Sequence, residues 1–149
     1  MITTTYSEKQ TFNLGKKIAK KLQGGEIIGL TGDLGAGKTV FIKGLTKGLS
    51  VRQAITSPTF VLMKIYPISN PCLRRQDKSK ILNFCHIDAY RLSSGQDLID
   101  VGVKDWLNQA NTITVIEWAE RVKDILPKNA IFVKIKFGKR KNQRTIEIK

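Results

Sequence analysis

Residues 32–39 read Gly-Asp-Leu-Gly-Ala-Gly-Lys-Thr, and this stretch decides the fold. It fits the pattern G-x-x-x-x-G-K-[ST] of a phosphate-binding loop, whose glycines let the backbone turn its N–H groups onto phosphate oxygens. Lys38 is placed to reach the β- and γ-phosphates of a nucleotide, and the Thr39 hydroxyl is placed to ligate Mg²⁺. A chance match in a chain of 149 residues has odds of roughly 1%. The stretch therefore predicts nucleotide binding.

The segments on both sides of this loop support the prediction. Residues 26–31, upstream, read as a short buried strand. Downstream, apolar residues recur at helical spacing: Phe41, Ile42, Leu45 and Leu49. The loop thus joins a strand to a helix, whose N-terminal dipole helps to hold an anion. We expect an α/β fold over residues 1–149, a single P-loop NTPase-like domain with a central mixed, largely parallel sheet flanked by helices.

The remaining elements follow from periodicity and turn residues. Ser7-Glu8-Lys9-Gln10 resembles a capping box that opens a helix, which ends at Gly24-Gly25. Further helices are predicted after Ser94, over 103–109 and over 118–126, and strands over 59–66, 81–88 and 112–117. Residues 131–137 alternate, with Ile131, Val133, Ile135 and Phe137 on the core face, and 144–148 pair back as an edge strand in a C-terminal β-hairpin. Residues 67–80 contain two prolines and four basic residues and are predicted to form an exposed loop.

The composition excludes several classes of protein. No apolar run approaches the roughly 18 residues of a membrane helix, and the first residues lack the basic start and apolar stretch of a signal peptide. Two cysteines, Cys72 and Cys85, make no disulfide framework, and with a single histidine a zinc site is not expected. Cys85 lies in an apolar strand pattern and is predicted to be a buried thiol. We expect a cytoplasmic protein with no membrane partner.

The net charge is +14 and the isoelectric point is about 10.0. Residues 128–149 hold eight Lys and Arg and one acid, which is half of the net charge. Such a balance points to a polyanionic partner such as nucleic acid. The alternative is a lysine-rich solvated surface that reflects compositional bias. Charge alone leaves the two interpretations open.

Two acids end apolar strands and are candidates to serve the phosphate loop. They are Asp88, in His-Ile-Asp at 86–88, and Glu117, after Ile113–Ile116. In proteins with such a loop, one acid holds Mg²⁺ or its waters and another orients the attacking water. The alternative is an ordinary strand-end acid in a cap or a surface salt bridge. Residues 57–60, Ser-Pro-Thr-Phe, are either a segment that senses the γ-phosphate or a turn before a strand.

Taken together, the ordered motifs resemble the TsaE family, small bacterial ATPases of tRNA threonylcarbamoyladenosine biosynthesis. The resemblance rests on Gly-Asp-Leu-Gly-Ala-Gly-Lys-Thr (32–39), Ser-Pro-Thr-Phe (57–60), His-x-Asp-x-Tyr-Arg-Leu (86–92) and Ile-Glu-Trp-x-Glu (116–120). Asp97-Leu98 with Gly102 and a late Arg-x-Ile-Glu (144–147) also fit. No single block is decisive, but the ordered set is specific and runs from about Ser7 onward.

The resemblance implies an ATPase that is weak alone and that works with the TsaD–TsaB complex. That complex modifies the adenosine 3′ of the anticodon, so tRNA is implied as a partner through the complex, and no DNA partner is expected. ATP and Mg²⁺ are the implied cofactors. Lys38, Asp88 and Glu117 are implied in catalysis, and Asp88 is implied to assist hydrolysis. Thr39 and Glu117 are implied to hold Mg²⁺. The residues implied to bind nucleotide are Thr11, Leu34, Gly35, Ala36, Gly37, Lys38, Thr39 and Trp118.

Some features depart from the family. The 67–80 loop is longer than usual, Asp105 stands where a Glu often follows Gly102, and the charge is extreme. Two rival functions stay open: a small-molecule P-loop kinase and a non-enzymatic basic RNA-binding module. A kinase needs an acceptor pocket and a lid, for which the chain has little room. The RNA-binding module leaves the phosphate loop and both acids unexplained. A GTPase is disfavoured because no Asn/Thr-Lys-x-Asp guanine signature is present.

Overall fold

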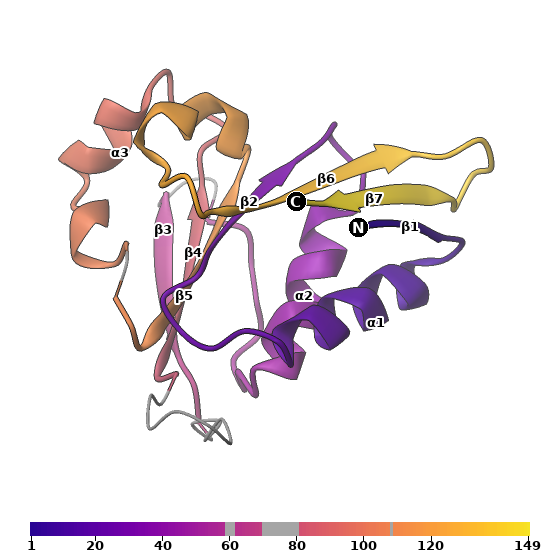
Figure 1. The fold of residues 1–149 in the computed structure, drawn as a ribbon, viewed down its shortest axis with the longest axis horizontal. Helices are drawn as coiled ribbons and strands as arrows, with labels where there is room; N and C mark the ends of the chain where they lie inside the picture. Colours follow the sequence, from indigo (N-terminus) through magenta and orange to yellow (C-terminus); the bar gives the residue numbers. More distant parts are fainter. Residues whose placement is uncertain (59–61, 70–80, 108) are drawn as a thin grey trace.

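A computed structural model of the chain describes residues 1–58, 62–69, 81–107 and 109–149 and shows one seven-stranded sheet with helices on both faces (Figure 1). The strand order is β1-β7-β6-β2-β5-β4-β3. The strands are β1 (Ile2–Thr5), β2 (Ile27–Thr31), β3 (Met63–Pro67), β4 (Asn83–Asp88), β5 (Thr112–Glu117), β6 (Ile131–Phe137) and β7 (Arg144–Ile148). Strands β6, β2, β5 and β4 run parallel, whereas β3, β7 and β1 pair antiparallel. The predicted α/β fold with a mixed sheet and a parallel core is confirmed.

Two long helices cover one face of the sheet. Helix α1 (Glu8–Ala19) begins at Ser7, whose side chain accepts a hydrogen bond from the backbone N–H of Gln10, as the predicted cap requires. Helix α2 (Lys38–Gly48) starts directly from the glycine-rich loop. The two helices touch through glycines, and a Cβ at Gly44 would collide with the carbonyl oxygen of Phe12. This close approach packs α1 tightly against the helix that carries the loop.

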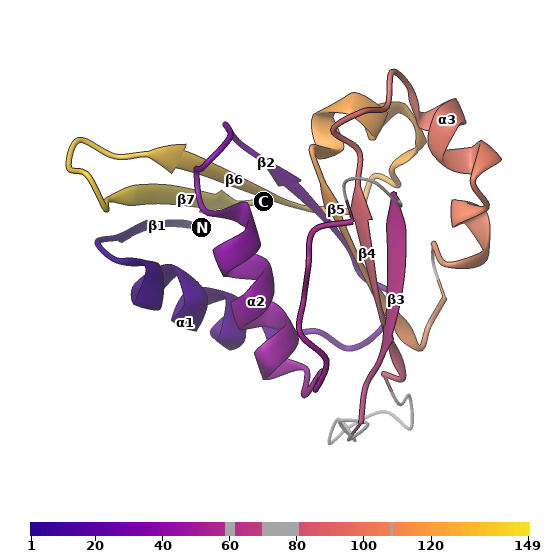
Figure 2. The ribbon, with the colours of Figure 1, turned by 180° about the vertical axis from the view of Figure 1, so that it is seen from behind.

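Short irregular elements cover the other face. They are α3 (Gly95–Asp100) and two 3₁₀ segments, η1 (Val103–Asp105) and η2 (Ala119–Ile125). Seen from behind, α1 and α2 lie on one side of the strands and α3 on the opposite side (Figure 2). The predicted helix after Ser94 is confirmed. The predicted helix over 103–109 is wrong, because only a 3₁₀ turn forms there among the described residues, and 118–126 is 3₁₀ with a non-helical Val122.

Alternation along the strands divides the core into two apolar layers. The layer under α1 and α2 includes Ile28, Leu30, Phe84, Ile113, Val115, Val133 and Ile135. The layer under α3, η1 and η2 includes Ile27, Cys85, Ile87 and Ile116. By the same alternation, His86 and Asp88 on β4 and Glu117 on β5 lie on the α1–α2 face. The three polar side chains at the carboxyl ends of these strands therefore point toward the helix that follows the loop.

At the N-terminal side, residues 2–5 form a strand that periodicity did not predict. Strand β1 pairs antiparallel with β7, so β7 is not the edge strand that the sequence suggested. Alternation predicts Phe137 on the core face, but its side chain is 51% exposed in the structure. The reason is register: β6 pairs with β2 only from Ile131 to Lys134, so Phe137 extends beyond the covered sheet.

The segment over 67–80 differs in part from the predicted exposed loop. Pro67 ends β3, and Ile68 is buried and forms an isolated bridge with Val51. Residues 70–80, with most of the predicted loop, lie outside the described residues, as do 59–61 of the strand predicted over 59–66. That strand begins at Met63 in the structure, and the strand predicted over 81–88 begins at Asn83.

Candidate functional site

The glycine-rich loop runs from the end of β2 to the first turn of α2. Gly37 is the N-cap of α2 and has φ +108, a left-handed conformation that glycine adopts without strain. The loop closes on itself through a hydrogen bond from the N–H of Ala36 to the carbonyl of Asp33, 3.1 Å long. Successive backbone N–H groups in such a turn at a helix N-terminus form an anion-binding concavity.

The Lys38 side chain bends back over this loop. Its Nζ donates to the carbonyl oxygens of Gly32 and Asp33, at 2.6 and 3.0 Å. The ammonium also lies 3.8 Å from the centroid of the Trp118 ring, a cation–π contact. Trp118 reaches it because its own backbone is left-handed, with φ +59, directly after β5.

Two opposing effects act on the pKa of Lys38. Burial lowers the pKa of its ammonium from the ordinary value, because desolvation penalises the charged form. Four nearby carboxylates oppose this shift in pKa: Glu117, Glu120, Asp88 and Asp33. The site thus combines a buried cation with several acids around it.

Asp88 is buried and firmly held at the end of β4. Its Oδ2 accepts a hydrogen bond from the Ser57 hydroxyl, and its Oδ1 accepts one from the backbone N–H of Tyr90, both at 2.9 Å. Asp88 lies directly opposite Glu117 in the parallel β4–β5 register. The two acids predicted from the sequence therefore lie side by side at one edge of the sheet.

Glu117 has a different partner. Its Oε1 lies 2.8 Å from Nε2 of His86, which is fully buried on the neighbouring strand. Glu117 is also opposite Leu30 of β2, one residue before that strand ends. Its carboxylate therefore sits between the end of the loop-bearing strand and β4.

These side chains line one cavity of about 390 Å³ beside the loop. Its lining residues are Leu34, Lys38, Thr39, Ser57, Asp88, Tyr90, Glu117 and Trp118. The structure thus brings together a lysine, a hydroxyl and two carboxylates from three separate parts of the chain. Within the described residues, no three His, Cys, Asp or Glu side chains form a metal site by themselves. Hydroxyl and carboxylate oxygens suit Mg²⁺, which commonly binds through one or two carboxylates plus substrate phosphates.

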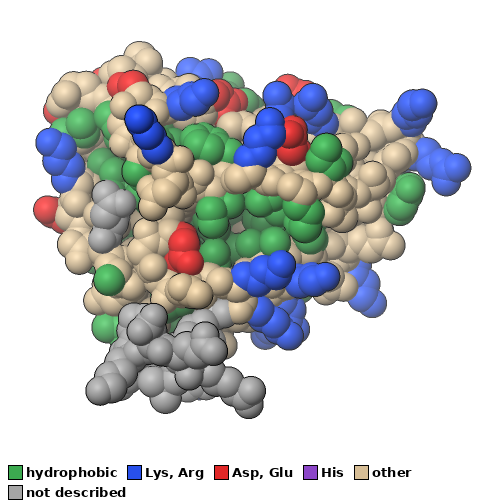
Figure 3. Space-filling view, viewed as in Figure 1, with side chains coloured by type: hydrophobic (Ala, Val, Ile, Leu, Met, Phe, Trp, Pro, Cys, Tyr) green, Lys and Arg blue, Asp and Glu red, His purple; other side chains and the backbone are tan. Residues whose placement is uncertain are grey.

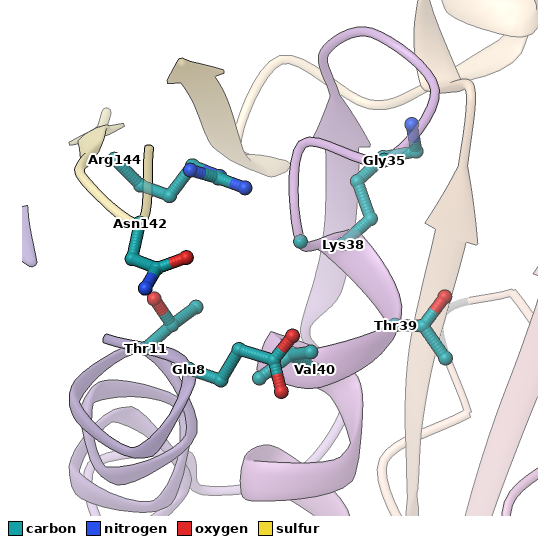
Figure 4. Close-up of a pocket in the computed structure, with 9 residues that line it drawn as sticks. Glu8, Thr11, Gly35, Lys38, Thr39, Val40, Asn142 and Arg144 are labelled. Carbon is teal, nitrogen blue, oxygen red and sulfur yellow. The ribbon is translucent and has the colours of Figure 1, made fainter. Parts of the chain in front are cut away.

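A second cavity of about 210 Å³ lies on the other side of the loop, between α1 and the β6–β7 hairpin. Its lining residues are Glu8, Thr11, Gly35, Gly37, Lys38, Thr39, Val40, Asn142 and Arg144 (Figure 4). Figure 4 shows Thr39 directed away from Thr11, on the far side of the first turn of α2. Arg144 also fixes the loop, because its Nε donates to the carbonyl of Ala36 at 2.9 Å.

The sequence missed several residues that the structure places here. On the sequence, His86 and Arg144 are only members of motifs, and Asn142 is only part of the predicted C-terminal β-hairpin. The position of His86, two residues before Asp88 in a strand, could have placed it on the same face. Its contact with Glu117, and that of Arg144 with Ala36, required the strand register and the fold.

None of the helices in the described ranges has the length and apolarity needed to cross a bilayer. Cys85, predicted as a buried thiol, is fully buried, and burial raises its pKa to about 12. The contribution of each predicted site residue to binding or catalysis stays a prediction.

Comparison with known proteins places the chain in a family. Residues 5–146 match the family described as threonylcarbamoyl adenosine biosynthesis protein TsaE. The chain is 35% identical over 130 residues to the tRNA threonylcarbamoyladenosine biosynthesis protein TsaE of Treponema pallidum, covering 87% of each chain. It is 40% identical over 107 residues to the protein of that name from Streptomyces coelicolor, covering 72% of this chain and 66% of that one.

A solved structure agrees with these sequence matches. The crystal structure of Bacillus subtilis YdiB superposes with a TM-score of 0.75 at 26% identity, covering 98% of this chain and 82% of that one. The protein is a member of the TsaE family, and its role lies in tRNA threonylcarbamoyladenosine biosynthesis.

Proposed function

We propose that the protein is a Mg²⁺-dependent P-loop ATPase whose nucleotide cycle supports the TsaD–TsaB complex in forming threonylcarbamoyladenosine in tRNA. One observation carries the chemical part of this proposal. The cavity beside the glycine-rich loop gathers Lys38, Thr39, Asp88 and Glu117 in one place. A phosphate loop, a hydroxyl and two strand-end acids are the parts that nucleotide hydrolysis needs.

The nucleotide is proposed to occupy both cavities, which meet at the loop. Its phosphates lie on the backbone N–H groups of residues 34–39, and its base and ribose lie in the cavity lined by Thr11 and Arg144. Gly35, Gly37, Lys38 and Thr39 are positioned to serve this arrangement, since all four line the cavity beside Thr11 and Arg144. Lys38 and Thr39 also line the cavity that holds the two acids. The Lys38 ammonium then exchanges its two carbonyl partners for phosphate oxygens.

The acids have separate roles in the proposed reaction. Thr39 and Glu117 hold Mg²⁺, which when bound neutralises phosphate charge. Asp88 orients the attacking water, because Ser57 and the N–H of Tyr90 fix both of its oxygens. Trp118 steadies Lys38 through the contact between its ring and the ammonium. Since the acids are buried, few waters compete with these contacts.

The proposed partners are the TsaD and TsaB proteins, with tRNA reached through their complex in the cytoplasm. Membership of the TsaE family supports this assignment. The basic surface supports it as well, because Lys and Arg side chains gather over the end of the molecule formed by α1 and the hairpin (Figure 3). A positive surface favours approach to an assembly that contains RNA.

The test measures ATP hydrolysis by the protein alone and with TsaD–TsaB, with Mg²⁺ or with a chelator. We expect slow turnover alone, a clear increase with the partners, and no turnover in chelator. Repeated rounds of tRNA modification by TsaD–TsaB should need the parent protein and ATP. Turnover that responds to small acceptors instead of TsaD–TsaB supports the kinase alternative. Salt-dependent tRNA binding without turnover supports the RNA-binding module.

A further inference from the structure

We propose that His86 is a positioning residue that holds the Glu117 carboxylate ready for the cation. The inference rests on the proposed function and deepens it. His86 is the single histidine of the chain, is fully buried in β4, and has its Nε2 2.8 Å from Oε1 of Glu117. No motif on the sequence assigned a role to this side chain, and the geometry gives it one.

Strand register explains how the contact arises. His86 is opposite Val115 in the parallel β4–β5 ladder, and the next pair on the same face is Asp88 with Glu117. The imidazole therefore reaches diagonally across the ladder to the acid at the strand end. Because both residues lie on the α1–α2 face, the carboxylate that His86 holds also borders the cavity of Lys38 and Thr39.

The identity of the donor follows from the acceptor. A carboxylate offers only acceptor oxygens, so Nε2 carries the hydrogen and donates it to Glu117. The other ring nitrogen, Nδ1, is buried and has no hydrogen-bond partner among the described residues. Burying an unpaired polar atom costs free energy, so an apolar side chain would fill this place in the core at a lower cost. The hydrogen bond to Glu117 is the contribution of His86 that an apolar residue at this position could not make.

The neighbouring acid, Asp88, is also held in place by hydrogen bonds, but from other donors. Asp88 is oriented by Ser57 and by the backbone N–H of Tyr90, whereas the hydrogen bond to Glu117 comes from His86. A carboxylate held in one rotamer loses less freedom when a cation arrives. His86 is expected to tighten cation binding without touching the nucleotide itself.

Two substitutions separate the two nitrogens of the ring. In His86→Gln, the side-chain amide nitrogen can take the place of Nε2 and still donate to Glu117. In His86→Asn, the shorter side chain places its amide nearer to Nδ1 and cannot reach the carboxylate. We would measure the affinity for a fluorescent ADP analogue with Mg²⁺ and with a chelator, together with the Mg²⁺ midpoint of ATP hydrolysis and the unfolding midpoint without nucleotide.

We expect His86→Asn to raise the Mg²⁺ midpoint by about tenfold or more, the usual effect of removing a partner of a metal ligand. Affinity in chelator should stay near that of the parent, and His86→Gln should restore the midpoint to within about threefold. In a Glu117→Gln background, His86→Asn should cause no further shift, because the effect passes through Glu117. Should His86→Asn not fold, His86→Leu, which removes both nitrogens, takes its place in the same titrations.

An unchanged Mg²⁺ midpoint in His86→Asn would overturn the inference. So would equal shifts in the Asn and Gln variants, or a loss of affinity in chelator as large as the loss with Mg²⁺, since both point to a structural role. The proposed function fails in a distinguishable way, because then the parent itself shows no Mg²⁺-dependent turnover.

Discussion

The two helical layers of the molecule are built in opposite ways. On one face of the sheet, α1 and α2 are regular helices pressed together through glycines. On the other, α3, η1 and η2 are short, and η2 is interrupted at Val122. The first layer carries the phosphate loop, and the second supplies Trp118, which enters the site from a left-handed turn. A rigid layer thus presents the loop, and an irregular one adds the aromatic side chain.

The two layers also differ in charge. Residues 1–56, which include α1 and α2, have nine Lys and Arg and three acids. Residues 89–126, which include α3, η1 and η2, have four Lys and Arg and six acids, of which Glu117 lies on the α1–α2 face. The positive net charge of +14 is therefore concentrated outside the irregular layer. Compositional bias alone would spread lysine over both, so the asymmetry favours a partner on the basic side.

The largest expected effect tests the packing difference. Gly44→Ala places a methyl group against the backbone carbonyl of Phe12, which cannot move without shifting α1. At Gly95, in the other layer, the atoms nearest to an added methyl group belong to the side chains of Ile125 and Asp124. We expect a loss of about 3 kcal/mol in the free energy of unfolding for Gly44→Ala and about 1 kcal/mol for Gly95→Ala, measured by urea denaturation. Equal losses would show that the two layers are packed alike.

The second prediction concerns Lys38, whose ammonium at the start of α2 contacts Trp118 of the irregular layer. Lys38→Ala removes the charge proposed to bind phosphates, and we expect ATP affinity to fall about 100-fold, as for the loss of a strong charge-assisted contact. The fold should persist, because burial already lowers the pKa of this ammonium and so opposes its charge. Lys43→Ala, at an exposed position of α2, is the control and should bind ATP normally. Calorimetry measures the ATP affinity of each variant. If Lys38→Ala binds ATP as tightly as the parent, Lys38 does not contribute to the nucleotide site.

The third prediction uses pH to probe the irregular layer. Burial raises the pKa of Cys85 to about 12, so its thiol ionises later in the native state than in the unfolded state. Its contribution to stability is complete below the unfolded pKa and declines as pH rises from about 9 toward 12. We expect the parent to lose up to about 1.4 kcal/mol per pH unit more than Cys85→Ala in that range. Denaturant curves at pH 8.5 to 10.5 test this, and parallel pH slopes would contradict it.

The smallest effect tests the charge asymmetry. Replacing Lys139 and Lys141 at the hairpin turn by Gln should slow association with a TsaD–TsaB–tRNA assembly roughly threefold at low salt and flatten its salt dependence. Replacing Lys104 and Lys123 near the irregular layer removes the same charge and should have less effect. Stopped-flow association at several salt concentrations compares the two variants. If both behave like the parent, the basic surface is only a solvated face.

The sequence predicted the positions of the glycine-rich loop and of both acids at the ends of neighbouring strands, because local signals define them. The octapeptide at 32–39 is a contiguous motif, and Asp88 and Glu117 each end an apolar run. It missed β1 because Ile-Thr-Thr-Thr carries a single apolar residue and its partner strand is far along the chain. Phe137 and His86 show the limit of alternation, which gives the face of a side chain but not what covers it. That depends on register with neighbouring strands.

The place of β7 has a consequence for how the protein is made. Its Arg144 holds the carbonyl of Ala36 in the phosphate loop, and β7 is also the strand on which β1 pairs. A ribosome delivers β1 and the loop early and β7 more than a hundred residues later. Without β7, β1 lacks its pairing strand and the loop lacks the hydrogen bond from Arg144. Under the proposed function, a chain truncated before β7 lacks the hydrogen bond from Arg144 to the loop and should therefore bind ATP more weakly.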